Sequence, residues 1–175
     1  ENLRFIILEV QNQVRSMADF IEQPSRSLYE RIISKDDYID NLKAVIENMC
    51  FTRIHSQPPD QKEINKIRSI QTIGVNLERM ADFCVNIARQ MGYLDDPAIL
   101  NQYEYEPAFD LIEKSLNRIR PVFHAADLAG ALSICKTEYG LDEIYKTCFD
   151  RIMNELETGG DARRPGRRRR RGHRP

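Results

Sequence analysis

The sequence predicts an all-α protein. Long segments carry apolar residues at every third or fourth position, which is the spacing of one helix face. Residues that break helices are few, with only 8 Gly and 8 Pro in a chain of 175 residues. The turns between the first segments are short, which favours an antiparallel bundle. We therefore expect one domain, or one domain and part of another, built from helices that are stabilised by packing on each other.

The first 92 residues are expected to form a complete three-helix bundle. Its helices are predicted over residues 2–23, 27–54 and 60–91. Ser27 is expected to cap the second helix, since a glutamate follows three residues later, and Asp60 is expected to cap the third. We expect the apolar stripes to meet in a core that contains Ile39, Leu42, Ile46, Leu77, Ala81 and Cys84.

The rest of the chain looks like an incomplete second copy of this bundle. Residues 93–105 are expected to be a linker and residues 106–158 to hold two helices, with the second running from 127 to 158 up to a glycine pair. Its first two helices would match those of the bundle, and the position of a third lies beyond residue 175. Uncovered apolar faces would favour a homo-oligomer. These faces include Leu111, Leu116, Ile119, Leu132, Ile144 and Ile152.

The charge is divided unevenly along the chain. Residues 1–158 carry 18 Lys and Arg against 26 Asp and Glu, whereas residues 159–175 carry 8 Arg and 1 Asp. We expect this basic tail to be disordered, because it offers almost no apolar side chain to bury. By charge alone it could bind nucleic acid or anionic lipid, although it has no aromatic residues to stack on bases. A nucleic-acid-binding regulator is therefore the alternative function, and a non-native end in place of a sixth helix is the other interpretation of the tail.

Four carboxylates are predicted to share one seam of the bundle. Asp36 and Asp40 lie four residues apart on the second helix, and Glu78 and Asp82 have the same spacing on the third. An antiparallel turn near residues 57–58 would place Asp36 level with Glu78, and Asp82 one turn beyond Asp36. Oxygen-rich clusters of this kind suit hard cations such as Fe³⁺, Mg²⁺ or Mn²⁺.

Two further features bear on this predicted metal site. Asn76 would lie opposite Asp40 and could add a neutral oxygen ligand, and Glu138 with Asp142 repeats the acidic spacing as a weak second half-site. The alternative is a solvated acidic face, neutralised by Lys43 and Arg79.

Nothing in the sequence predicts an enzyme. The histidines His55, His124 and His173 stand alone, and no metal-protease motif, phosphate-binding glycine loop or nucleophile motif occurs. The four cysteines are scattered, as expected of small buried residues in a reducing cytosol. No apolar run approaches the roughly 18 residues needed to span a bilayer.

The third helix resembles the signature of the PhoU family, regulators of phosphate uptake. Its stretch GVNLERMADFCVNIARQMG is similar to the family segment DLERIGDHAVNIA, with Asn76 in place of the usual Asp and Phe83 in place of the usual His. The matching residues are Leu77, Glu78, Arg79, Asp82, Val85, Asn86, Ile87 and Ala88.

This resemblance carries several expectations. It implies two three-helix repeats and metal clusters (iron, or Mn, Mg or Zn) on E/DxxxD motifs such as Asp36/Asp40 and Glu78/Asp82. It also implies a cytoplasmic, non-catalytic adaptor that represses phosphate-starvation signalling. Its partners would be the phosphate ABC transporter and a sensor histidine kinase, and it would meet the membrane only through the transporter.

Overall fold

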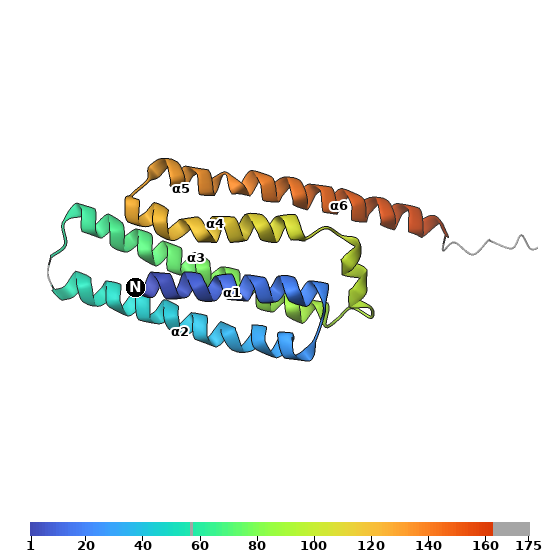
Figure 1. Ribbon diagram of the computed structural model, residues 1–175, viewed down its shortest axis with the longest axis horizontal. Coiled ribbons are helices and arrows are strands. Elements are labelled where there is room, and N and C mark those ends of the chain that lie inside the picture. Colours follow the sequence, from blue (N-terminus) through green and yellow to red (C-terminus); the bar gives the residue numbers. More distant parts are fainter. Residues whose placement is uncertain (57, 163–175) are drawn as a thin grey trace, which may run out of the picture.

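The structure is a computed structural model that describes residues 1–56 and 58–162, and over these residues it contains helices and no strand (Figure 1). The all-α prediction is confirmed. Disorder was expected over residues 159–175, but residues 159–162 belong to α6, and residues 163–175 lie outside the described residues. The helices are α1 (Asn2–Glu22), α2 (Arg26–Ser56), α3 (Gln61–Met91), the 3-10 helix η1 (Pro97–Gln102), α4 (Glu106–Ala125), α5 (Leu128–Cys135) and α6 (Thr137–Ala162).

Helices α1, α2 and α3 form the predicted antiparallel bundle, in which each helix packs on the other two. Of the six residues expected in its core, only Leu42 is not fully buried. The buried positions of α2 include Ile32, Ile39 and Ile46, which recur every seven residues, so Leu42 falls at the edge of that stripe and is half-buried. The confirmed core residues are Ile39, Ile46, Leu77, Ala81 and Cys84.

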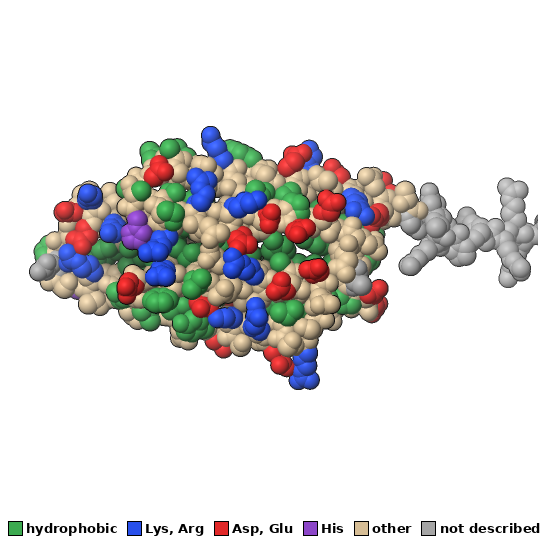
Figure 2. Space-filling model, in the orientation of Figure 1, with side chains coloured by type: hydrophobic (Ala, Val, Ile, Leu, Met, Phe, Trp, Pro, Cys, Tyr) green, Lys and Arg blue, Asp and Glu red, His purple; other side chains and the backbone are tan. Residues whose placement is uncertain are grey.

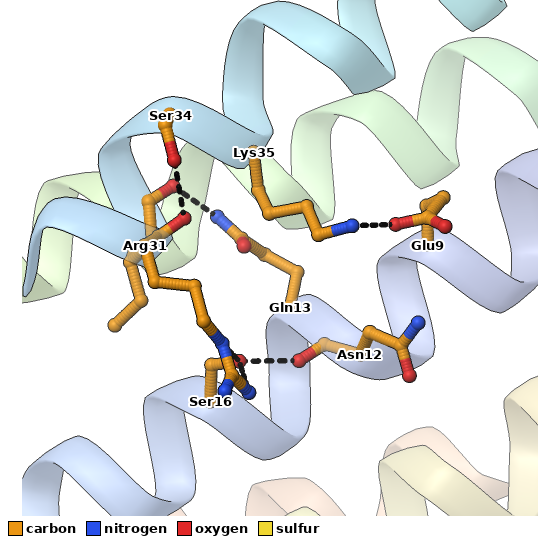
Figure 3. Close-up of polar contacts among 8 residues, drawn as sticks. Glu9, Asn12, Gln13, Ser16, Arg31, Ser34 and Lys35 are labelled. Carbon is orange, nitrogen blue, oxygen red and sulfur yellow. Dashed lines mark hydrogen bonds and ion pairs between the residues drawn. The ribbon is translucent and has the colours of Figure 1, made fainter. Parts of the chain in front are cut away.

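A polar seam fixes α1 against α2 inside this bundle (Figure 3). Gln13 is fully buried, and its Nε2 donates to a main-chain carbonyl of α2 at 2.8 Å. Arg31 Nη2 donates to the Ser16 hydroxyl at 2.6 Å, and Lys35 pairs with Glu9 further along the seam. A buried amide without a hydrogen bond would cost about 1–3 kcal/mol, so these contacts favour one register of the two helices.

The helix starts follow local capping chemistry, with one correction. Asp60 caps α3 as predicted, because its Oδ1 accepts the backbone N–H three residues later at 2.7 Å. The prediction for α2 was wrong. The helix already begins at Arg26, and Ser25 Oγ rather than Ser27 accepts a first-turn N–H, that of Leu28, at 3.3 Å.

The second half of the described chain lies on one side of the bundle. Helix α4 packs on α1, α6 packs on α4, and η1, inside the expected linker, packs on α1. The single helix predicted over residues 127–158 is instead two helices, α5 and α6, which meet at Lys136. The glycine pair at 159–160 does not end α6, which extends to Ala162. A helical glycine costs only about 1 kcal/mol, so it weakens a helix without stopping it.

Helix α6 has no buried residue over positions 137–158. Among the residues expected to be uncovered, Leu132 is exposed but Leu116 is not, because Leu116 is buried where α4 meets the bundle. Helix α6 itself exposes large apolar side chains, so self-association through this half stays a prediction. These side chains are Tyr139, Tyr145, Phe149, Ile152, Met153 and Leu156.

Two glycines are expected to respond to alanine with opposite signs. A Cβ added at Gly74 would meet Ile46 at 3.9 Å, which is ordinary contact, so Gly74→Ala should stabilise the protein by about 0.5–1 kcal/mol. At Gly130 the added Cβ would lie 2.8 Å from Val122 Cγ2 and 2.4 Å from the capping Asp127 Oδ2. Gly130→Ala should therefore destabilise by about 1–3 kcal/mol. Urea unfolding of both variants checks this, and a gain in stability at Gly130 would contradict it.

Candidate cation site between α2 and α3

The structure brings the two acidic pairs together across α2 and α3, one helical turn away from the predicted levels. Asp40 interacts with Glu78, and Asp36 interacts with Asp82, whereas the sequence placed Asp36 level with Glu78. The cause is the position of the turn. Helix α2 continues to Ser56 instead of ending near residue 54, so the point about which the helices reverse moves along the chain.

Asp36 lies in an unfavourable setting for a lone carboxylate. Burial raises the pKa of the Asp36 carboxyl, and the negative charges of Asp82, Asp40 and Asp37 raise it further, while Arg89 opposes them. Its Oδ1 is buried and has no hydrogen-bond partner among residues 1–56 and 58–162. This oxygen is therefore available to a cation or a proton.

The second acidic pair already has a cation beside it. Burial raises the pKa of Asp40, and hydrogen bonding to Glu78 and repulsion from it add to the effect. Lys43 forms an ion pair with Glu78, and the hydrogen bond to Glu78 raises the pKa of the Lys43 ammonium. The alternative interpretation was an acidic face neutralised by Lys43 and Arg79. Lys43 does pair with this face, whereas Arg79 is exposed and makes no ion pair within the described chain.

The chemistry of these side chains suits a hard cation. They are carboxylates, and one oxygen of Asp36 is buried without a hydrogen-bond partner within the described residues. In the arrangement described, no three acidic, histidine or cysteine side chains of residues 1–56 and 58–162 are grouped closely enough to hold a metal. The side chains would have to rearrange around an ion. Asn76 is exposed and its Nδ2 donates to the Thr72 carbonyl at 2.9 Å.

The predicted second half-site lies apart from the bundle. Glu138 and Asp142 are both exposed on α6, which packs on α4 and not on α2 or α3. Within the described chain, neither Glu138 nor Asp142 forms an ion pair, and no group of three metal-ligating side chains forms around them.

Comparison with known proteins decides the family. Residues 5–91 match the sequence model of the PhoU domain, a range that coincides with α1, α2 and α3. The chain belongs to the PhoU family. Within this PhoU domain, the signature motif lies on α3 and supplies Glu78 and Asp82 to the acidic seam between α2 and α3.

Several curated relatives extend the similarity into α4–α6. A "Phosphate-specific transport system accessory protein PhoU homolog" of Clostridium acetobutylicum is 26% identical over 155 residues, which are 82% of this chain and 67% of that protein. The PhoU homolog of Borreliella burgdorferi is 27% identical over 133 residues, 71% of this chain and 59% of that protein. PhoU homolog 1 of Thermotoga maritima is 24% identical over 153 residues, 86% of this chain and 66% of that protein.

The chain thus spans roughly three fifths to two thirds of the length of these relatives. No solved structure matches it. Within the described residues, no helix is both long enough and apolar enough to cross a membrane.

The cysteines and His55 are other potentially reactive side chains, in the PhoU domain or beyond it. Burial raises the pKa of the Cys84 thiol to about 12, so it stays protonated and unreactive beneath the acidic seam. Cys50 is buried as well, whereas Cys135 is exposed, contrary to the expected burial of all four cysteines. His55 lies in the last turn of α2, where its ring packs on Phe51 with centroids 3.9 Å apart.

Sequence reasoning missed Arg89 as a partner of the acidic seam. It lies seven residues after Asp82 on α3, which is two turns along the same face, so the helical period already pointed to it. Its relation to Asp36 depends on how α2 packs on α3, and that was not readable from either helix alone.

Removing the Asp36 charge is expected to stabilise metal-free protein at neutral pH. The pKa of Asp36 is raised in the folded state, so the folded state binds the proton more tightly than the unfolded state does. The contribution of Asp36 to the free energy of unfolding therefore falls as the pH rises. Asp36→Asn should gain less than about 1 kcal/mol at pH 7, because the cluster is partly solvated. The gain should shrink as the pH falls towards the ordinary aspartate range. Thermal midpoints with a chelator at several pH values measure it, and a loss of stability at neutral pH would contradict it.

Proposed function

We propose that this protein is a non-catalytic, cytoplasmic regulator of phosphate uptake and phosphate-starvation signalling that works as an adaptor. The observation that carries the proposal is the PhoU domain over residues 5–91, together with relatives named as accessory proteins of the phosphate-specific transport system. The surface of the described chain agrees with a binding protein, since it exposes many large apolar side chains on α2 and α6.

The partners belong to this proposal. We infer that the adaptor contacts the phosphate ABC transporter and its sensor histidine kinase, and that it reaches the membrane only through the transporter. The similarity to the named relatives supports a role beside the transporter. The kinase follows from the family resemblance alone, and the chain covers only part of each relative.

A cation at the acidic seam is the second part of the proposal. Asp36, Asp40, Glu78 and Asp82 would hold iron, or Mn, Mg or Zn, with Asn76 as a neutral oxygen ligand. When bound, the ion would supply positive charge that joins α2 to α3. The buried Asp36 oxygen without a partner supports this role, and the exposed pair Glu138 and Asp142 would bind weakly at most.

A reporter strain tests the regulatory role. In a host whose own gene is deleted, phosphate-starvation genes should be expressed even in high phosphate, and the chain should restore their repression. The variant Glu78→Gln/Asp82→Asn separates the metal from the adaptor, because repression without metal binding would leave the adaptor role intact. If the chain fails to restore repression in a deletion host that has lost it, the proposal is overturned.

Deleting residues 159–175 separates the adaptor from the nucleic-acid alternative. An adaptor that works through its helices should keep binding its partner and restoring repression without the basic tail. Loss of regulation together with loss of binding to nucleic acid would favour the alternative.

A further inference from the structure

A cavity of about 250 Å³ lies between α1 of the PhoU domain and α4. Its apolar floor includes the buried Ile7 and Leu116. Gln11 Nε2 donates to Asn117 Oδ1 across the cavity at 2.8 Å. Because Asn117 uses its oxygen to accept, its Nδ2 keeps its hydrogens for another acceptor.

The charged side chains that line this cavity are two arginines, Arg4 and Arg120, and no acid lines it. Neither guanidinium group makes an ion pair or a hydrogen bond within the described parts of the chain. The neighbouring Arg15, by contrast, pairs with Glu113 across the same two helices. In Figure 2, Lys and Arg side chains lie around the region where α1 begins and α4 ends in Figure 1, with some Asp and Glu side chains among them.

This local excess of positive charge stands out in an acidic protein, because residues 1–158 carry 26 acidic against 18 basic side chains. Two guanidinium groups offer planar forks of N–H donors that match the oxygens of a phosphate group, and they stay charged at any physiological pH. The two guanidinium groups and Asn117 Nδ2 are donors, and both charges of the lining are positive, so the site favours an anion.

We propose that this cavity binds a phosphate group, either as free phosphate or on a small phosphate ester. Arg4 and Arg120 hold the phosphate oxygens and Asn117 Nδ2 adds a further donor. The volume suits a ligand of few atoms, since pockets for drug-sized ligands begin at about 300 Å³. The ligand would bridge the PhoU domain and α4. This site is separate from the acidic seam and does not rest on the adaptor function proposed above.

Calorimetric titration of the full chain tests the site, with inorganic phosphate and glycerol phosphate as probes at constant ionic strength. We expect saturable binding of at least one probe, and Arg4→Gln/Arg120→Gln should weaken it about tenfold or more. Arg120→Lys should weaken binding less, because the charge remains but the fork is lost. Arg79→Gln is the matched control, an exposed arginine of α3 outside the cavity, and should bind like the wild type.

Two further probes decide the class of ligand. Acetate should bind more weakly than phosphate, and vesicles containing phosphatidylglycerol should bind no better than phosphatidylcholine vesicles. Circular dichroism confirms that the arginine variants fold, which their exposure predicts. The proposal is overturned if neither phosphate probe saturates, if the double variant binds as tightly as Arg79→Gln, or if only the anionic vesicles bind.

Discussion

Leu77→Ala is expected to lower the free energy of unfolding by about 2–5 kcal/mol, the usual range for a buried leucine. Leu77 is 1% exposed and belongs to the core shared by α1, α2 and α3. Truncation removes apolar contacts and leaves a cavity that helices packed on both sides cannot close. Urea unfolding followed by circular dichroism measures the loss.

Leu42→Ala is the matched control for this experiment. The same atoms are removed, but Leu42 is only half-buried at the edge of the α2 stripe, so the loss should be clearly smaller. Equal losses at the two positions would show that α2 presents a different face to the bundle. A loss below about 1 kcal/mol at Leu77 would contradict the described core.

Metal-stripped protein is expected to gain stability on titration with a hard cation, by about 2.7 kcal/mol at a hundredfold excess over the dissociation constant. The ion would neutralise Asp36 and Asp40, whose pKa is raised by burial and by the neighbouring charges of Asp82 and Glu78. Asn76 supplies no charge where the family often has Asp, so a trivalent ion should lose more affinity than a divalent one. Fe³⁺, Mn²⁺ and Mg²⁺ are compared by thermal midpoint and calorimetry.

Two double variants make this test specific. Glu78→Gln/Asp82→Asn should abolish the metal-induced rise in midpoint. Glu138→Gln/Asp142→Asn removes the same two side-chain types from the exposed face of α6 and should leave it unchanged. If the first variant binds metal as tightly as the wild type, the seam is a solvated acidic face neutralised by Lys43, and the adaptor must work without a metal there.

Local chemistry explains which parts of the fold were predictable. Asp60 could be assigned as a cap because the side chain bonds to a backbone N–H only three residues away. The start of α2 was misplaced, because Ser25 and not the predicted Ser27 accepts a first-turn N–H. The break at Lys136 was missed because no proline or turn motif marks it.

The candidate site divides in the same way. Helical spacing alone put Asp36 with Asp40 and Glu78 with Asp82, since residues four apart share a face. The facing of Asp40 to Glu78, the ion pair of Lys43 and the influence of Arg89 depend on interhelical register. That register depends on packing between the helices, for example where Gly74 of α3 lies close to Ile46 of α2. A shift of one helical turn would give each acidic side chain a different neighbour on the facing helix.

The sequence by itself determined the all-α class, the extent of the three-helix bundle and the acidic motifs, because apolar period and capping act over a few neighbouring residues. Only the tertiary structure decided that Leu42 lies at an edge, that the acidic pairs meet one turn from their expected levels, and that Arg4 and Arg120 line one cavity. Such facts depend on contacts between residues far apart in the chain. Their energies are set by how whole helices fit together, and no single helix carries that information.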